Sequence, residues 1–295
     1  MTPDFLKNVF LLCAVSSVTF GVVGAFVVAR RIGYLTGAIS HSAFGGIGFG
    51  LWLKQRVALG AFGTACLFSH CCKSSESSCL EKCEFLSRFI NPVPAALLFA
   101  LLAAILVDWI RKRAKEREET LLGAIWALGM ALGLLFLEGV SGYVSATTYL
   151  FGDVLLVSKV DVWTATALGA IILTIVACDF KKLEAVCFDE EYAELRGVNI
   201  GFQNRLLLVV TAVSVVLMLR VVGMAMIVAL LTLPAATASR FTKRLSSSII
   251  LSTIICFVGS WLGVWLSYLL NSSTGPTIIL VIATFYAVSL PFGKR

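Results

Sequence analysis

The chain has 295 residues, of which 59% are hydrophobic and only 14% are charged, and its formal net charge is +7 at pH 7. Soluble domains carry roughly 25% charged residues, and the apolar residues here form long uncharged blocks near the ~20 residues that span a bilayer as a helix. This composition excludes a soluble globular fold, and the absence of short alternating segments excludes a membrane β-barrel. We expect an all-α bundle of transmembrane helices, because a backbone inside lipid must satisfy its own hydrogen bonds.

Nine uncharged blocks predict about nine helices in a single domain, 1–295. They are Val9–Ala29, Gly37–Leu53, Pro92–Val107, Leu121–Leu137, Val162–Cys178, Leu206–Leu219, Val221–Ser239, Leu245–Leu270 and Pro276–Phe292. The first block ends in Arg30-Arg31 without a small-residue cleavage pattern, so we interpret it as a retained helix rather than a signal peptide. A shorter run, Val57–Phe68, is too brief to span a bilayer and is expected to be re-entrant or interfacial.

Basic residues indicate which helix ends face the cytoplasm. They gather in segments 111–117, 181–205, 240–244 and 294–295. Two blocks separate each cluster from the next, so all four can lie on the cytoplasmic side under the positive-inside rule. Arg30 and Arg31 fall on the same side, which puts the N-terminus outside, while Arg220 is an exception. This placement accounts for the positive charge without nucleic-acid binding.

The segment 56–91 is then a cysteine-rich extracytoplasmic loop. It carries Cys71, Cys72, Cys79 and Cys83, with His70 beside them and Cys66 shortly before. In an oxidising compartment such cysteines form disulfides. Thiolates and imidazole also suit zinc and copper, but the spacing matches no zinc template, so we favour disulfides over a metal-collecting loop.

His41 is a titratable residue inside an otherwise uncharged helix block. Such a group is costly at membrane depth and usually faces a pathway or the bundle interior, and imidazole is a common ligand of first-row metals. The alternative is a buried histidine bonded to a neighbouring helix. The residues that follow include Gly45, Gly46, Gly48 and Gly50, which offer a small-residue face for close helix packing.

Three later segments carry further signals. In the cytoplasmic segment 180–204, Asp189 can cap and Gly197 can end a short helix that docks a partner, although an ordinary solvated loop is the alternative. Pro234 is expected to interrupt its membrane helix. The dipeptide Gly275-Pro276 marks a turn that leads into the last helix.

Five segments, in order, resemble the ABC-3 family, the permease subunits of bacterial zinc, manganese and iron importers. They are Arg30–Gly46 and the stretches FGDVLLVSKVD at Phe151–Asp161, EEYAELRGV at Glu190–Val198, VGMAMIVALLTLPAATA at Val222–Ala238 and GPTIIL at Gly275–Leu280. The matches cover nearly the whole chain. Segment 57–90, by contrast, looks like an insertion relative to the family.

The resemblance implies a multi-pass permease of the bacterial inner membrane that holds no permanent cofactor and conducts a divalent metal ion as cargo. Its partners would be a cytoplasmic ATP-binding subunit, an extracytoplasmic metal-binding protein and a second permease subunit, identical or different. His41 would contact the metal, with Ser40 as a possible helper. Contacts to the ATPase would come from Asp189, Glu190, Glu191, Glu194 and Gly197.

Two positions depart from the family pattern. Gly37 stands where the family usually has an acidic residue, and Trp126-Ala127 stands where some relatives have a histidine. A lone imidazole is a poor site for a divalent cation, because dehydrating the ion requires several ligands. The residues do not identify the metal.

Other classes of function fit less well. The sequence has no GxxxxGK[ST] pattern, so ATP hydrolysis by that route must come from another subunit, and it has no HExxH pattern of a membrane metalloprotease. An ion-coupled secondary transporter would need acidic residues at the midplane, whereas Asp108, Glu138 and Asp179 fall at predicted helix ends. A permease for a siderophore would need a wider cavity than the small residues of Gly37–Gly50 suggest.

Overall fold

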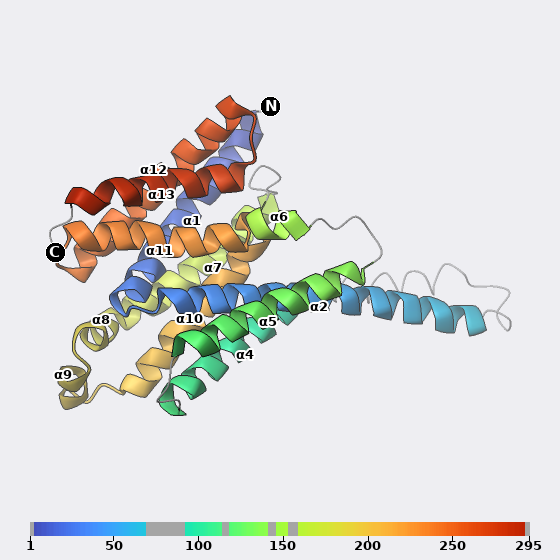
Figure 1. Cartoon of the computed structure of the whole chain (residues 1–295), viewed down its shortest axis with the longest axis horizontal. Helices are drawn as coiled ribbons and strands as arrows, with labels where there is room; N and C mark the ends of the chain where they lie inside the picture. The colour runs from blue at the N-terminus through green and yellow to red at the C-terminus, as the bar shows by residue number, and fades with distance from the viewer. Residues whose placement is uncertain (1–2, 69–91, 114–117, 141–145, 153–158, 293–295) are drawn as a thin grey trace.

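The computed structural model describes residues 3–68, 92–113, 118–140, 146–152 and 159–292. Within these ranges the chain is all-helical, without strands (Figure 1). The twelve helices are α1 (Pro3–Ala29), α2 (Gly33–Phe68), α4 (Pro92–Arg113), α5 (Glu118–Glu138), α6 (Ala146–Phe151), α7 (Lys159–Cys178), α8 (Phe180–Phe188), α9 (Glu190–Leu195), α10 (Ile200–Val222), α11 (Met224–Phe241), α12 (Leu245–Leu270) and α13 (Thr274–Phe292). Cys71, Cys72, Cys79 and Cys83 lie outside the described residues.

The nine predicted blocks each correspond to one long helix, and the all-α membrane bundle is confirmed. Seven helices are long and apolar enough to cross a membrane, namely α1, α4, α5, α7, α11, α12 and α13. The remaining two blocks lie in α2 and α10, and α10 has a shorter apolar part, Ile200–Val216. The other three described helices, α6, α8 and α9, have 6 to 9 residues.

Helix α2 corrects one expectation. Val57–Phe68 is not a separate re-entrant or interfacial piece, because α2 continues from Gly33 to Phe68 as one helix of 36 residues. At 1.5 Å per residue this helix is about 54 Å long, well beyond the ~30 Å hydrocarbon core. Figure 1 shows its last turns projecting past the other helices.

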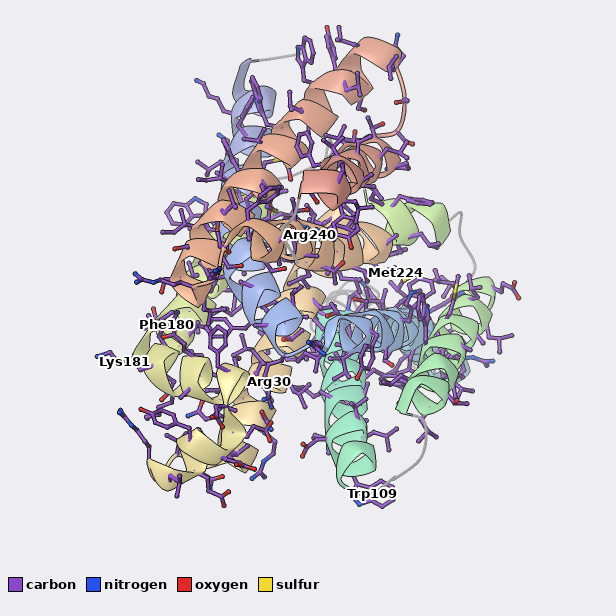
Figure 2. The ribbon with its side chains drawn as sticks, turned by 60° about the vertical axis from the view of Figure 1, so that its left-hand side comes forward. Arg30, Trp109, Phe180, Lys181, Met224 and Arg240 are labelled. Atoms are coloured by element: carbon purple, nitrogen blue, oxygen red, sulfur yellow. The ribbon has the colours of Figure 1, made fainter. Side chains whose placement is uncertain are left out.

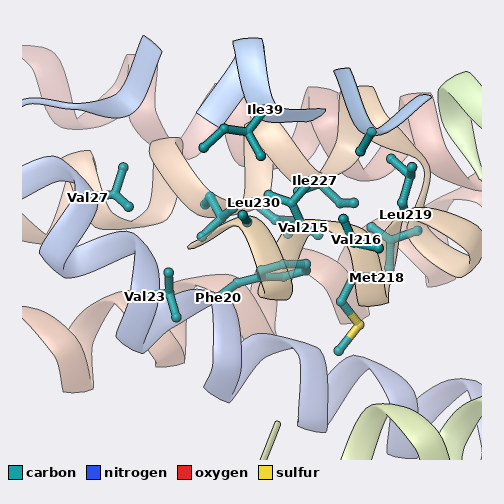
Figure 3. Close-up of a cluster of buried hydrophobic side chains, with 14 of the residues drawn as sticks. Phe20, Val23, Val27, Ile39, Val215, Val216, Met218, Leu219, Ile227 and Leu230 are labelled. Carbon is teal, nitrogen blue, oxygen red and sulfur yellow. The ribbon is translucent and has the colours of Figure 1, made fainter. Parts of the chain in front are cut away.

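The core lies where α1, α2, α10 and α11 meet. Helices α4 and α5 pack on α2, whereas α7, α11 and α12 pack on α1, and α10 contacts both groups. Figure 3 shows the apolar side chains at this centre, including Phe20 of α1, Ile39 of α2, Leu219 of α10 and Ile227 of α11, all of which are fully buried. A continuous apolar contact thus joins the two groups of helices.

The short helices α8 and α9 and several chain reversals gather at one end of the bundle. In Figure 1, α8 and α9 lie on the same side as the end of α13. Arg30 contacts the α8–α9 segment there, and Arg240 of α11 donates to the carbonyl of Leu290 in α13 at 3.2 Å. The basic segments 181–205 and 240–244 thus share one end with Arg30, as predicted, and the assignment of that end to the cytoplasm stays a prediction.

A junction of three glycines lies between α6, the α10–α11 break and the start of α13. Gly223, with φ +81°, ends α10 and begins α11, and Gly152, with φ +72°, follows α6. A Cβ on Gly223 would overlap the Gly152 backbone, and a Cβ on Gly275 would overlap the Phe151 carbonyl. The three backbones meet at distances that only glycine permits.

The position of the helix break also corrects the expectation for Pro234. The proline lies inside α11, which continues past it to Phe241. The break in this part of the chain is at Gly223 instead. Gly275 and Pro276 lie in the first turn of α13, which begins at Thr274, as the sequence predicted.

Candidate translocation and coupling sites

His41 is buried between α2 and α5. Its ring lies against the indole of Trp126, with the ring centroids 4.8 Å apart and the planes tilted by 36°. Its Nδ1 atom is buried and makes no hydrogen bond within the described part of the chain. The structure therefore does not show the alternative of a histidine bonded through this atom to a neighbouring helix. A buried nitrogen without a partner is costly.

Glycines on both helices bring α5 this close to His41. A Cβ on Gly129 would lie 2.7 Å from the backbone carbonyl of His41, and one on Gly48 would lie 2.6 Å from the carbonyl of Gly133. Gly46 and Gly50 turn instead toward α4, where a Cβ would come within 3 Å of its backbone. The predicted small-residue face therefore serves two neighbouring helices, as expected for close packing in membranes.

Trp126 covers both His41 and the position one turn before it. A Cβ on Gly37 would meet the indole at 3.8 Å, an ordinary contact. Trp126 nevertheless remains 47% exposed. Sequence reasoning noted Trp126 only as a departure from the family pattern and missed this contact, which depends on the register between two helices.

The structure does not pair Ser40 with His41. The Ser40 hydroxyl donates to the carbonyl of Thr36 at 2.8 Å, within its own helix. Neighbouring residues of a helix point about 100° apart, so Ser40 and His41 lie on different faces of α2. Among the described residues no three His, Cys, Asp or Glu side chains group to hold a metal ion, and this region contributes one imidazole per chain.

The coupling segment consists of two short helices. Asp189 has an extended backbone, and its carboxylate accepts from the N–H of Tyr192 at 3.0 Å, which caps α9. At the other end Gly197, with φ +75°, donates to Glu194, and Val198 donates to Ala193. This 6→1 and 5→2 pattern is a Schellman motif, so both predicted signals act as the sequence indicated.

Helix α8 was not predicted. Its signal is the spacing of Phe180, Leu183 and Val186 along one face, and Leu183 and Val186 are buried. Phe180 packs edge-on against Phe26 of α1, with the centroids 5.9 Å apart. Lys181, labelled in Figure 2, projects from the outer edge of the helix.

Helix α9 and the end of α8 present a mixed apolar and acidic surface. Leu195 is 88% exposed, and Phe188 and Tyr192 are also exposed, whereas Ala193 is buried against the bundle. Glu191 and Glu194 are exposed beside them. Large apolar side chains next to charges at a bundle end are typical of a surface that meets a protein partner.

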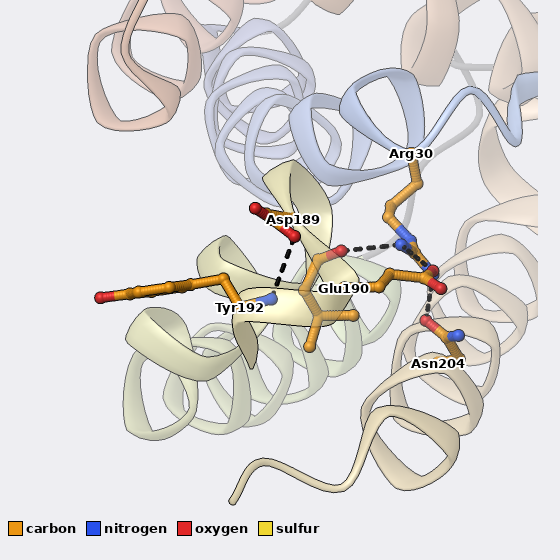
Figure 4. Close-up of polar contacts among 6 residues, drawn as sticks. Arg30, Asp189, Glu190, Tyr192 and Asn204 are labelled. Carbon is orange, nitrogen blue, oxygen red and sulfur yellow. Dashed lines mark hydrogen bonds and ion pairs between the residues drawn. The ribbon is translucent and has the colours of Figure 1, made fainter. Parts of the chain in front are cut away.

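Arg30 joins this segment to the rest of the bundle. Its Nη1 donates to the carbonyl of Val186 and to Oε1 of Glu190, each at 2.7 Å, and its Nη2 donates to Oδ1 of Asn204 on α10 (Figure 4). The Arg30 side chain is only 10% exposed. The sequence identified Arg30 as an orientation marker, and nothing local indicated these partners.

Cys187 lies between Val186 and the exposed Phe188. Burial raises the pKa of the Cys187 thiol to about 11, the nearby Arg30 guanidinium opposes this rise, and Glu184 adds to it. A raised pKa keeps the thiol protonated near neutral pH. The half-buried side chain of Cys187 packs here as a protonated thiol.

Seven described helices long and apolar enough to cross a membrane, with a buried imidazole between two of the bundle's helices, define a multi-spanning membrane protein. The family model described as ABC 3 transport family matches residues 2–79 and 85–293, and the chain belongs to this family. The match continues through Cys79, and so extends into segment 57–90, which we expected to be an insertion.

Relatives match over nearly the full length. The chain is 30% identical over 291 residues to a protein of Chlamydia pneumoniae named probable metal transport system membrane protein, covering 98% of this chain and 89% of that protein. It is 27% identical to the manganese import system permease protein ScaB of Streptococcus gordonii, covering 97% and 90%. The solved structure of PsaBC from Streptococcus pneumoniae in complex with Fab superposes with a TM-score of 0.77 at 27% identity, covering 97% of this chain and 90% of that chain.

Family membership defines the class of the protein. The chain is a membrane-spanning permease subunit of an ABC transporter, and a separate subunit hydrolyses ATP. It is a multi-pass protein of the bacterial inner membrane. The alternatives of an ion-coupled secondary transporter and of a membrane enzyme are thereby set aside.

Proposed function

We propose that this permease forms the pathway of an ATP-driven importer for a divalent transition metal: manganese, zinc or iron. The observation that carries the proposal is the buried His41, whose Nδ1 has no partner in the described structure and lies where α5 and α2 pack closely. A buried, unpaired imidazole is suited to contact a passing metal ion. The names of two relatives, a manganese permease and a metal transport system membrane protein, support this cargo class.

One chain supplies too few ligands for a divalent ion. Two permease subunits, identical or different, would contribute an imidazole each if both carry the histidine, and backbone carbonyls would add oxygen; Ser40, which faces another side of α2, is not included. Manganese prefers oxygen ligands, while imidazole suits zinc and iron. The relatives favour manganese and the ligand type favours zinc or iron, so all three metals belong in the test.

The remaining subunits follow from the surface of the bundle. A cytoplasmic ATPase would dock on α8–α9, where Asp189 and Gly197 fix the fold of α9 and Glu190, Glu191 and Glu194 supply charge. An extracytoplasmic metal-binding protein would deliver the ion to the opposite end. The metal is cargo, and no permanent cofactor is proposed.

The test is uptake into proteoliposomes that contain the permease, its ATPase and its binding protein. Radiolabelled manganese, zinc and iron are offered separately, with ATP or with a non-hydrolysable analogue. We expect ATP-dependent accumulation of one metal, and a fall of about tenfold or more in His41→Ala. Ser42→Ala, the neighbouring buried residue, is the control and should transport normally.

Two results would count against the proposal. Normal uptake by His41→Ala would remove His41 from the pathway. No uptake of any of the three metals by an assembled wild-type complex would overturn the cargo class, and a siderophore would then be tested.

A further inference from the structure

We propose that Arg30 is a positioning residue that transmits movement of the α8–α9 coupling segment to α2, the helix that carries His41. This inference rests on the proposed function, because it concerns how ATP-driven motion reaches the metal pathway. Three observations carry it: the turn in which Arg30 lies, the partners of its guanidinium, and the burial of the side chain.

The turn between α1 and α2 is short and is closed by backbone hydrogen bonds. Ile32 N–H donates to Val27 at 3.0 Å and Arg31 N–H donates to Val28 at 2.9 Å, which closes α1 with a Schellman motif. Arg31 takes the left-handed conformation, φ +56°, that this motif requires. Leu35 N–H then donates to Ile32 at 2.9 Å, so α2 begins at once. A displacement of Arg30 is therefore carried directly into α2.

The guanidinium of Arg30 reaches three other elements. Val186 belongs to the last turn of α8, whose carbonyls lack intrahelical partners and carry the negative end of the helix dipole. Glu190 opens α9, and Asn204 lies in the second turn of α10. A guanidinium is always charged and offers five donors in a rigid plane. One side chain thus holds α8, α9 and α10 to the α1–α2 turn (Figure 4).

Burial strengthens this contact. Arg30 is 10% exposed, while its partner Glu190 is 53% exposed at the surface that would face the ATPase. A partly buried pair is screened less by water and salt than a fully exposed pair, which contributes little to stability. The pair Lys182–Asp179, at 2.7 Å, is by contrast confined to positions i and i+3 of one segment and joins no second helix.

The test compares three variants in the complete transporter of permease, ATPase and binding protein. The measured quantities are ATPase content after purification, the rate of ATP hydrolysis, and the number of metal ions imported per ATP hydrolysed. Arg30→Ala removes all three contacts, and Arg30→Lys keeps the charge but loses the planar fork. Arg205→Ala is the matched control, since Arg205 is a basic residue near the same end whose Nε donates within its own helix, to Gly201.

We expect Arg30→Ala to assemble and hydrolyse ATP while importing about tenfold fewer ions per ATP, a change worth 1.4 kcal/mol in coupling. Arg30→Lys should recover part of the ratio, and Arg205→Ala should match wild type. If Arg30→Ala does not assemble, Asn204→Ala removes one acceptor and should lower the same ratio by a smaller factor.

An unchanged ratio of ions to ATP in Arg30→Ala, or in Asn204→Ala where Arg30→Ala fails to assemble, would overturn the inference. Where Arg30→Ala does assemble, a partial loss of ATPase that accounts for the whole fall in uptake would also overturn it, because Arg30 would then only support docking. The wild-type transporter separates this result from the failure of the proposed function. If wild type imports none of the metals, the proposed cargo class is wrong. If wild type imports a metal and Arg30→Ala has the same ratio of ions to ATP, only the proposed role of Arg30 is removed.

Discussion

At the scale of single residues, the space around His41 decides what the pathway can bind. Gly37 lies one turn before His41 on the same face of α2, and Trp126 covers both positions. An aromatic ring therefore lies beside the imidazole, at the place where a carboxylate ligand could lie. A site of this composition offers nitrogen but little oxygen from side chains, which bears on the choice between metals.

Substituting Gly37 tests this consequence. A Cβ at this position has room, at 3.8 Å from the indole, so Gly37→Asp would place a carboxylate one turn from the imidazole. We expect manganese uptake to rise relative to zinc, because carboxylate oxygen suits manganese. Gly37→Asn, similar in size but neutral, is the control. The same manganese-to-zinc ratio in Gly37→Asp and wild type would contradict the expectation.

At the scale of helices, the α2–α5 contact depends on glycines that leave no room for a side chain. Gly129 faces the backbone of His41 and Ser42, while Gly123, two turns earlier on α5, faces open space. The two glycines thus have the same helix propensity but opposite surroundings. Their comparison separates helix packing from helix formation.

This difference gives a second test. Gly129→Ala should force α5 away from α2 and lower the free energy of unfolding by about 1–3 kcal/mol, as overpacking does, with a loss of uptake. Gly123→Ala should leave stability unchanged or raise it slightly, because alanine favours helix over glycine. Thermal unfolding in detergent measures both, and equal midpoints for the two variants would show that the contact does not limit stability.

The helices could be predicted from the sequence to the extent that local signals set them. Each apolar block became a helix, and Asp189 and Gly197 ended α9 as their residue types indicated. The prediction was wrong at Val57–Phe68, because charged residues such as Lys54 and Arg56 interrupt an apolar block without breaking a helix. The partners of Arg30 could not be predicted, since Val186 and Asn204 lie 156 and 174 positions away.

At the scale of the whole molecule, the glycine junction joins segments from three distant parts of the chain. Gly152, Gly223 and Gly275 bring the end of α6, the α10–α11 break and the start of α13 together. These positions belong to three of the segments that carry the family resemblance. The close backbone contact accounts for glycine at these three positions.

Gly223→Ala tests the junction. With φ +81° and ψ 151°, Gly223 lies in a backbone region that is essentially confined to glycine, where strain costs about 1–3 kcal/mol, and the Cβ would also overlap the Phe151–Gly152 backbone. Gly197→Ala is the matched control, because Gly197 has a similar φ of +75° and nothing within 4 Å of its Cβ position. We expect a larger fall in the thermal midpoint for Gly223→Ala, and equal falls would mean that the three segments can separate without loss.

The tight α1–α2 turn limits how the chain can vary in length. An α-helix turns by about 100° with each residue, and His41 is reached from the turn by continuous helix from Gly33. One residue inserted or deleted between Gly33 and His41 would rotate the imidazole off α5 while Arg30 kept its partners. This stretch acts as a spacer of fixed length: a substitution within it keeps the orientation of His41 relative to the turn, whereas an insertion or deletion does not.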